Sequence, residues 1–82
     1  METDRTVHAQ QGHVEIVRYE RAGKWYREWS GGRSCIPLTE AVENAIAMAT
    51  SGGTVHYGRS GGVQFDKRVR DALPVEDAEA ES

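Results

Sequence analysis

The sequence is poor in residues that would point to a specialised structural class. Its 82 residues include one cysteine and two prolines, and 7% of them are aromatic. A single cysteine, Cys35, excludes an intramolecular disulfide framework, and we interpret it as a small packed residue, not as a reactive thiol. No apolar run approaches membrane-spanning length, and the first residues lack the apolar core of a secretory signal. We therefore expect a cytoplasmic protein with no membrane contact.

The body of the chain also lacks an excess of charge of one sign. The formal net charge is -3, but residues 75–82 contain four acidic residues and no basic one. Once these four are subtracted, ten basic residues stand against nine acidic residues. A body this close to neutral argues against a dedicated nucleic-acid binder, which concentrates basic residues on one face.

Signatures of catalysis and of metal binding are missing as well. His8, His13 and His56 do not stand at the spacing of metal ligands, and no second cysteine accompanies them. The glycine-rich segment 58–62 is expected between two strands, whereas a phosphate-binding glycine loop opens a helix. We interpret it as a turn, and we predict no catalytic residue, no metal and no cofactor.

The remaining pattern predicts two strands that form a hairpin. The first begins near His13 and continues to Tyr19, and the second covers residues 24–30. The loop between them contains glycine and has a length that suits a hairpin. The two-residue repeat of a strand then divides the second strand between two faces, one with Trp25, Arg27 and Trp29 and the other with Tyr26 and Glu28.

A helix is predicted to follow the loop at residues 30–34. Thr39 is expected as its N-cap, and Glu40 complements the helix dipole. Gly52 and Gly53 are expected to end the helix, because glycine adopts the left-handed cap conformation without steric cost. Apolar residues at helical spacing predict the buried stripe, which consists of Ala41, Val42, Ala45, Ile46 and Ala49, with Met48 at its edge.

The second half of the sequence predicts two further strands, at 54–57 and 63–66, and one helical turn at 67–73. The expected fold class is α+β: a small antiparallel sheet in the order β-β-α-β-β, with one helix packed on one face. We divide the chain into a flexible N-terminal lead at 1–12, a single domain at 13–74, and a disordered acidic tail at 75–82.

Several of these motifs resemble those of small bacterial and phage domains of unknown function. The shared features are an aromatic strand (KWYREW), a helix that begins at Leu38-Thr39-Glu40-Ala41, the Gly52-Gly53 stop, and a turn from Gly58 to Gly61. The resemblance covers about residues 24–65. It implies a fold and carries no active site, because its motifs are turns, caps and core positions.

Our functional expectation is a non-enzymatic protein-interaction module, acting as a small phage or bacterial accessory or regulatory factor. The aromatic row on the second strand is either the bulk of a small core or a contact surface, and the sequence leaves both open. We expect a protein partner, and also self-association as a homodimer. The candidate interaction surface consists of Trp25, Arg27, Trp29, Tyr26, Arg33 and Arg59.

The alternative function is nucleic-acid binding through an Arg-rich sheet face and loops. In that case the acidic segment at 75–82 would act as a mimic or a brake. The candidate contacts are Arg18, Arg27, Arg33, Arg59, Lys67, Arg68 and Arg70.

Overall fold

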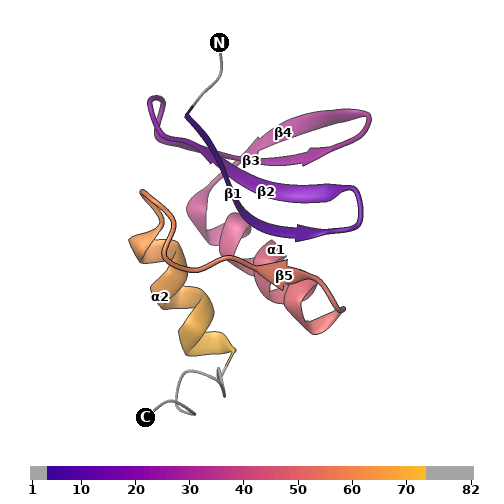
Figure 1. Ribbon diagram of the computed structural model, residues 1–82, viewed down its shortest axis with the longest axis vertical. Coiled ribbons are helices and arrows are strands. Elements are labelled where there is room, and N and C mark those ends of the chain that lie inside the picture. The colour runs from indigo at the N-terminus through magenta and orange to yellow at the C-terminus, as the bar shows by residue number, and fades with distance from the viewer. Residues whose placement is uncertain (1–3, 74–82) are drawn as a thin grey trace.

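The protein folds as an α+β domain with a five-stranded antiparallel sheet and two helices (Figure 1). The computed structural model describes residues 4–73. The elements in chain order are β1 (Arg5–Gln11), β2 (Val14–Tyr19), β3 (Lys24–Trp29), β4 (Gly32–Ile36), α1 (Leu38–Thr50), β5 (Thr54–Val55) and α2 (Val63–Ala72). The expected α+β class is therefore confirmed, with more strands and one more helix than predicted.

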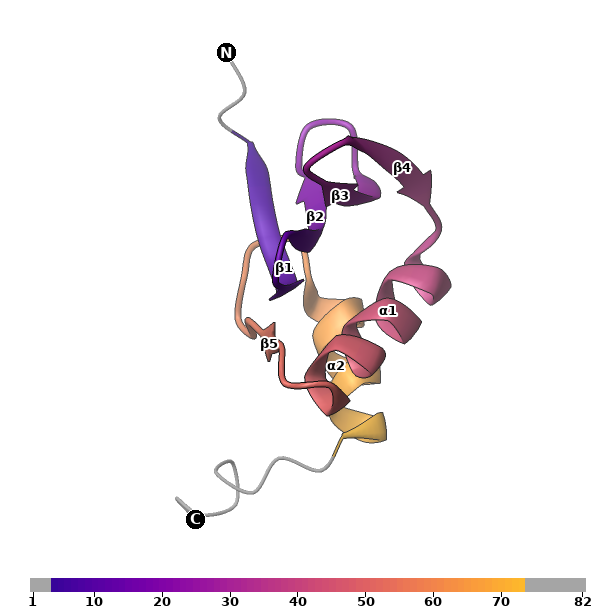
Figure 2. The ribbon, with the colours of Figure 1, turned by 90° about the vertical axis from the view of Figure 1, so that its right-hand side faces the viewer.

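The sheet is a meander to which one short strand is added at the far edge. Its strand order is β4-β3-β2-β1-β5, and every pair is antiparallel. Both helices lie on the same face of this sheet, and the opposite face is not covered by any element within residues 4–73 (Figure 2). The two edges are β4 and the two-residue strand β5.

The core lies between the sheet and the two helices. Trp25 is 7% exposed and stacks on Phe65 of α2, with ring centroids 4.9 Å apart. The helix α1 contributes small side chains, as its apolar stripe predicted, and Ile46 of that stripe is only partly buried. The buried core consists of Ala9, Ile16, Trp25, Ile36, Ala41, Val42, Ala45, Met48, Phe65 and Val69.

The expected flexible lead at 1–12 is wrong for residues 5–11, which form β1. This strand is paired on both sides, with β2 and with β5. A register shift lies between Val7 and Ala9, so one extra residue, His8, is inserted there. Both His8 and Ala9 are fully buried. This irregularity hides the two-residue alternation from which a strand is predicted.

The expected fourth strand at 63–66 is also wrong, because these residues begin α2. Phe65 and Val69 are both fully buried, and Leu73 packs against the same cluster. Their spacing of four residues is that of one helix face. Val63, which suggested a strand together with Phe65, is 76% exposed.

Two local expectations around α1 also need correction. Residues 32–36, placed mostly in a loop, form β4, which pairs with β3 from Trp29↔Gly32 to Trp25↔Ile36. The helix begins two residues earlier than expected, with Pro37 instead of Thr39 at the N-cap and no side-chain cap. Its end agrees with the prediction, since the helix stops at Thr50 and Gly52 has a φ of 99°.

The third expected strand, 54–57, is shorter in the structure, where β5 covers Thr54–Val55. The backbone N–H of His56 still donates to the carbonyl of His8 at 2.9 Å. The expected tail at 75–82 lies outside the described residues. Among the residues that the structure describes, no helix is long and apolar enough to cross a membrane.

Candidate functional site

The uncovered face of the sheet carries an organised group of polar and aromatic side chains. Alternate residues along a strand point to the same face of the sheet. Residues directly opposed on neighbouring strands also point to the same face, so the strand register identifies the residues of this face. We call this surface the open face, and its central residues are Arg5, Glu15, Val17, Tyr19, Tyr26, Glu28, Arg33 and Cys35. Val17 is fully buried although no helix covers it, and the residues opposed to it on the neighbouring strands are Val7 and Tyr26.

Two tyrosines and one arginine form the centre of the open face. The rings of Tyr19 and Tyr26 meet edge to face, with centroids 5.3 Å apart and an interplanar angle of 85°. The guanidinium carbon of Arg33 lies 4.8 Å from the Tyr26 ring centroid and 5.4 Å from that of Tyr19. Arg33 also donates from Nη1 to the Tyr19 hydroxyl at 3.2 Å. Cation–π contacts and a hydrogen bond therefore fix the arginine above both rings.

Glu28 connects this cluster to Arg5. The hydroxyl of Tyr19 donates to Glu28 Oε2 at 2.6 Å, and Arg5 Nη2 donates to Glu28 Oε1 at 2.7 Å. Arg5 also donates to Glu15 at 2.5 Å, and Arg33 Nη1 lies 3.7 Å from Glu28 Oε2. The two carboxylates, Glu15 and Glu28, oppose each other on β2 and β3, and the arginines of β1 and β4 balance their charges within the network.

The titration behaviour of Glu28 and Tyr19 follows from these contacts. Partial burial raises the pKa of Glu28, but the hydrogen bonds from Tyr19 and Arg5 and the nearby arginine charges outweigh it and lower the pKa below its usual value. The hydrogen bond to Glu28 raises the pKa of Tyr19. Glu28 is therefore held ionised and Tyr19 protonated, which keeps the network intact at neutral pH.

The structure divides the predicted interaction residues between different surfaces. Trp25 is buried, so it belongs to the core and not to a contact surface. Arg27 and Trp29 share the helix-side face with Trp25, as predicted, and the Arg27 guanidinium carbon lies 4.9 Å from the Trp29 ring centroid near the outer end of the sheet. Tyr26 and Arg33 lie on the open face.

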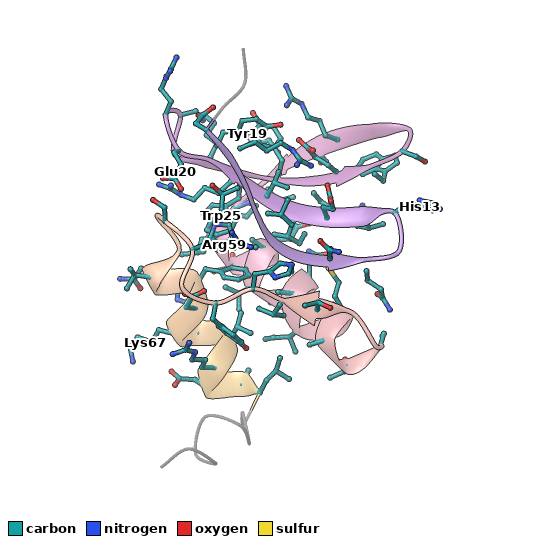
Figure 3. All side chains as sticks on the ribbon, in the orientation of Figure 1. His13, Tyr19, Glu20, Trp25, Arg59 and Lys67 are labelled. Atoms are coloured by element: carbon teal, nitrogen blue, oxygen red, sulfur yellow. The ribbon has the colours of Figure 1, made fainter. Side chains whose placement is uncertain are left out.

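The residues of the nucleic-acid alternative do not converge on one face either. Arg18 lies on the helix side of β2 and pairs with Glu20 at 2.7 Å, close to the loop that carries Arg59. Lys67 lies on the outer side of α2 (Figure 3), where Arg68 and Arg70 are also exposed. Arg70 lies over the ring of Tyr57 at 4.5 Å. Basic residues thus occupy at least three separate surfaces.

The glycine-rich segment 58–62 differs from its predicted setting, because it opens α2 and does not join two strands. Gly58 and Gly61 have positive φ values of 80° and 76°. The backbone N–H of Gly58 donates to Asp66 Oδ2 at 2.8 Å, so a residue of the first helical turn closes the loop. We still interpret segment 58–62 as a turn and not as a phosphate-binding loop, since the Gly58 N–H is already bound by Asp66.

The most unusual buried group is His8, which sequence reasoning missed. Its ring is fully buried and packs against both Trp25 and Phe65, with centroids 4.7 and 5.3 Å away. Neither ring nitrogen has a hydrogen-bond partner within residues 4–73, and neither does the buried Oδ1 of Asp66. Burial lowers the pKa of His8, and the nearby carboxylates of Asp66 and Glu20 do not compensate. His8 is the extra residue of the irregularity in β1, so the two-residue alternation of a strand did not predict that it would be buried.

A cluster of metal ligands is not assembled in the part of the chain that the structure describes. No three His, Cys, Asp or Glu residues gather there as metal ligands would. The expectation that Cys35 is a packed residue is wrong, because it is exposed on the edge strand β4, on the opposite face of the sheet from the buried His8. The open face is therefore the best-organised candidate site among residues 4–73.

Comparisons of the chain with protein-family models, curated proteins and solved structures give no match.

Proposed function

We propose that this protein is a non-enzymatic interaction module that binds a protein partner through the open face. The observation that carries the proposal is the cluster of Tyr19, Tyr26 and Arg33 on a sheet face that no described element covers. Tyrosine and arginine, together with tryptophan, are enriched among the residues that contribute most to protein–protein affinity. These side chains are already held by one another, so binding would order few of them.

The charge of the open face favours a protein over a nucleic acid. Arg5 and Arg33 are balanced by Glu15 and Glu28, and each arginine contacts at least one of these carboxylates. A phosphate backbone would meet the two glutamates together with the two arginines. A nucleic-acid binder needs an uncompensated basic surface, and its affinity falls steeply with salt. Nucleic-acid binding therefore stays the second choice, tested by a gel shift at several salt concentrations.

The test is affinity capture by two variants that differ in which surface they change. Tyr26→Ala removes one ring of the central cluster, and Arg68→Ala removes an exposed side chain from α2 on the opposite side of the domain. We expect a protein that is retained by wild type and by Arg68→Ala, resists nuclease treatment, and is lost with Tyr26→Ala. Circular dichroism establishes that both variants are folded. Equal retention by all three proteins, or loss on nuclease treatment, would overturn the proposal.

A further inference from the structure

The strand β4 leaves backbone groups free along its outer edge. It pairs only with β3, and the register ends at Trp29↔Gly32 across a two-residue turn. In an antiparallel pair, opposed residues alternate between exchanging both backbone hydrogen bonds and exchanging none. Because the pair next to a two-residue turn exchanges both, Gly32, Ser34 and Ile36 bond to β3. The N–H and C=O groups of Arg33 and Cys35 therefore point away from the sheet.

These outward groups stand on an accessible strand. Four of the five residues of β4 are exposed, and by this register the backbone N–H groups of Arg33 and Cys35 do not donate to β3. The other sheet edge, β5, has only two residues. An exposed edge of this kind is a template on which a further strand can pair.

An open groove lies beside the end of β4, where the chain turns into α1. Its volume is about 480 Å³, and the residues that line it include Lys24, Trp25, Ile36 and Leu38. A strand added to β4 would direct every second side chain to the helix side of the sheet. One of these side chains would meet the apolar wall formed by Ile36 and Leu38.

Apart from Glu28, the charged side chains of β3 and β4 are basic. Lys24 and Arg33 lie on the open-face side of β3 and β4, and Arg27 lies on the helix side. The only acidic residue of these two strands, Glu28, is 15% exposed; it is hydrogen-bonded to Arg5 and Tyr19 and lies 3.7 Å from Arg33, which is itself 53% exposed. The complement of this edge is therefore an acidic segment. A second copy of β4 is a poor complement, because it carries Arg33 and no acidic residue.

We propose that β4 receives an extended, acidic segment of a partner protein as an additional antiparallel or parallel strand. Acidic side chains four residues apart lie on the open-face side, one near Arg33 and one near Lys24 at the end of β4, and an apolar side chain between them enters the groove beside Ile36. This inference rests on the proposed function as a protein-interaction module and names the class of partner segment that the module binds.

The experiment is a selection from a display library of random decapeptides on the full-length protein. Enriched peptides are expected to carry two Asp or Glu residues four positions apart with an apolar residue between them. The selected peptide is then titrated against Cys35→Pro and Cys35→Ser. Both variants lose the thiol, but only Cys35→Pro loses the outward backbone N–H. The hydrogen bonds between β4 and β3 remain in Cys35→Pro, because they are formed by Ser34 and Ile36 and not by residue 35.

We expect Cys35→Pro to weaken peptide binding at least tenfold, with Cys35→Ser unchanged and Lys24→Glu also weakened. Urea denaturation confirms that each variant is folded. The proposal is overturned if no peptide is enriched, if the enriched peptides are basic or uncharged, or if both Cys35 variants bind equally. It is also overturned if wild type dimerises and Cys35→Pro abolishes the dimer, because a second copy then occupies β4.

The two proposals fail separately. If the partner lost by Tyr26→Ala is retained equally by Cys35→Pro and Cys35→Ser, the open face remains the interaction surface and strand addition at β4 is wrong.

Discussion

Replacing the buried His8 with leucine should change how the stability of this protein depends on pH. The imidazole of His8 is fully buried and has no hydrogen-bond partner for either nitrogen within residues 4–73. The groups that face it are Asp66 from α2, Glu20 and Arg18 from the region of β2, and Arg59 from the loop before α2. Burial dominates this balance and lowers the pKa of His8 in the folded protein.

The sign of the effect follows from proton linkage. Between the lowered folded pKa and the usual value of 6.5, the unfolded chain binds more protons than the folded one. The stability of the wild type is therefore complete above pH 6.5 and falls as the pH drops below it. Each unit by which the folded pKa is lowered corresponds to about 1.4 kcal/mol of stability lost on acidification.

The size of the effect at neutral pH comes from two opposing changes. A buried donor or acceptor without a partner costs about 1–3 kcal/mol, and leucine removes two such groups. The same change removes the ring contacts with Trp25 and Phe65, each worth about 0.5–1.5 kcal/mol. We expect His8→Leu to be as stable as wild type or more stable at pH 8, and its advantage to grow as the pH falls to 5.

The assay is urea denaturation followed by tryptophan fluorescence at several pH values, since Trp25 packs on the ring of His8. His13→Gln is the control, because it removes an imidazole from the exposed turn between β1 and β2, where the ring is hydrated in both states. Parallel pH profiles for wild type and His8→Leu would refute the reasoning. So would an NMR titration in which His8 gains its proton at or above pH 6.5.

Four further outcomes are expected. Phe65→Ala removes a fully buried ring and should cost about 3–5 kcal/mol, which urea denaturation measures; a loss below 1 kcal/mol would contradict the described core. Gly53→Ala should cost about 1–3 kcal/mol, because its Cβ would lie 2.6 Å from the carbonyl oxygen of Gln10, whereas Gly31→Ala, with no contact closer than 3.4 Å, should be nearly neutral. Glu28→Gln weakens charge-assisted hydrogen bonds and should cost about 1–3 kcal/mol at pH 7. Because the folded pKa of Glu28 is lowered, that cost should shrink as the pH falls below its ordinary value of 4.5, and a cost that stays constant down to pH 3 would argue against the network. Sedimentation at several concentrations should detect a dimer, and a monomer mass at every concentration would exclude self-association.

The sequence predicted the elements whose periodicity is regular. The hairpin of β2 and β3, the division of Trp25 and Tyr26 between opposite faces, and the alanine-rich face of α1 all follow from simple repeats of two or about four residues. The helix α2 was missed because Val63 and Phe65 mimic a strand, although Phe65 and Val69 carry the helical spacing. The strand β4 was missed because its polar residues belong to an exposed edge, where burial imposes no pattern.

The candidate site was only partly predictable for a related reason. The sequence identified Tyr26 and Arg33 as surface candidates but gave no sign that Tyr19, Glu28 and Arg5 would join them. These contacts depend on the register between strands, and Arg5 belongs to a segment whose strand character the irregularity at His8 conceals. Local patterns specify which face a residue occupies, whereas neighbours across strands depend on pairing that no single segment encodes.

The aromatic cluster of His8, Trp25 and Phe65 also constrains when the domain becomes complete during synthesis. The four-stranded meander contains only short-range pairings and ends at Ile36, so it can begin to pair early on the ribosome. Its inner face stays uncovered until α1 and then Phe65 have emerged from the exit tunnel. During that interval Trp25 is without its stacking partner, and this period is when a nascent chain of this protein is most exposed to chaperones and to aggregation.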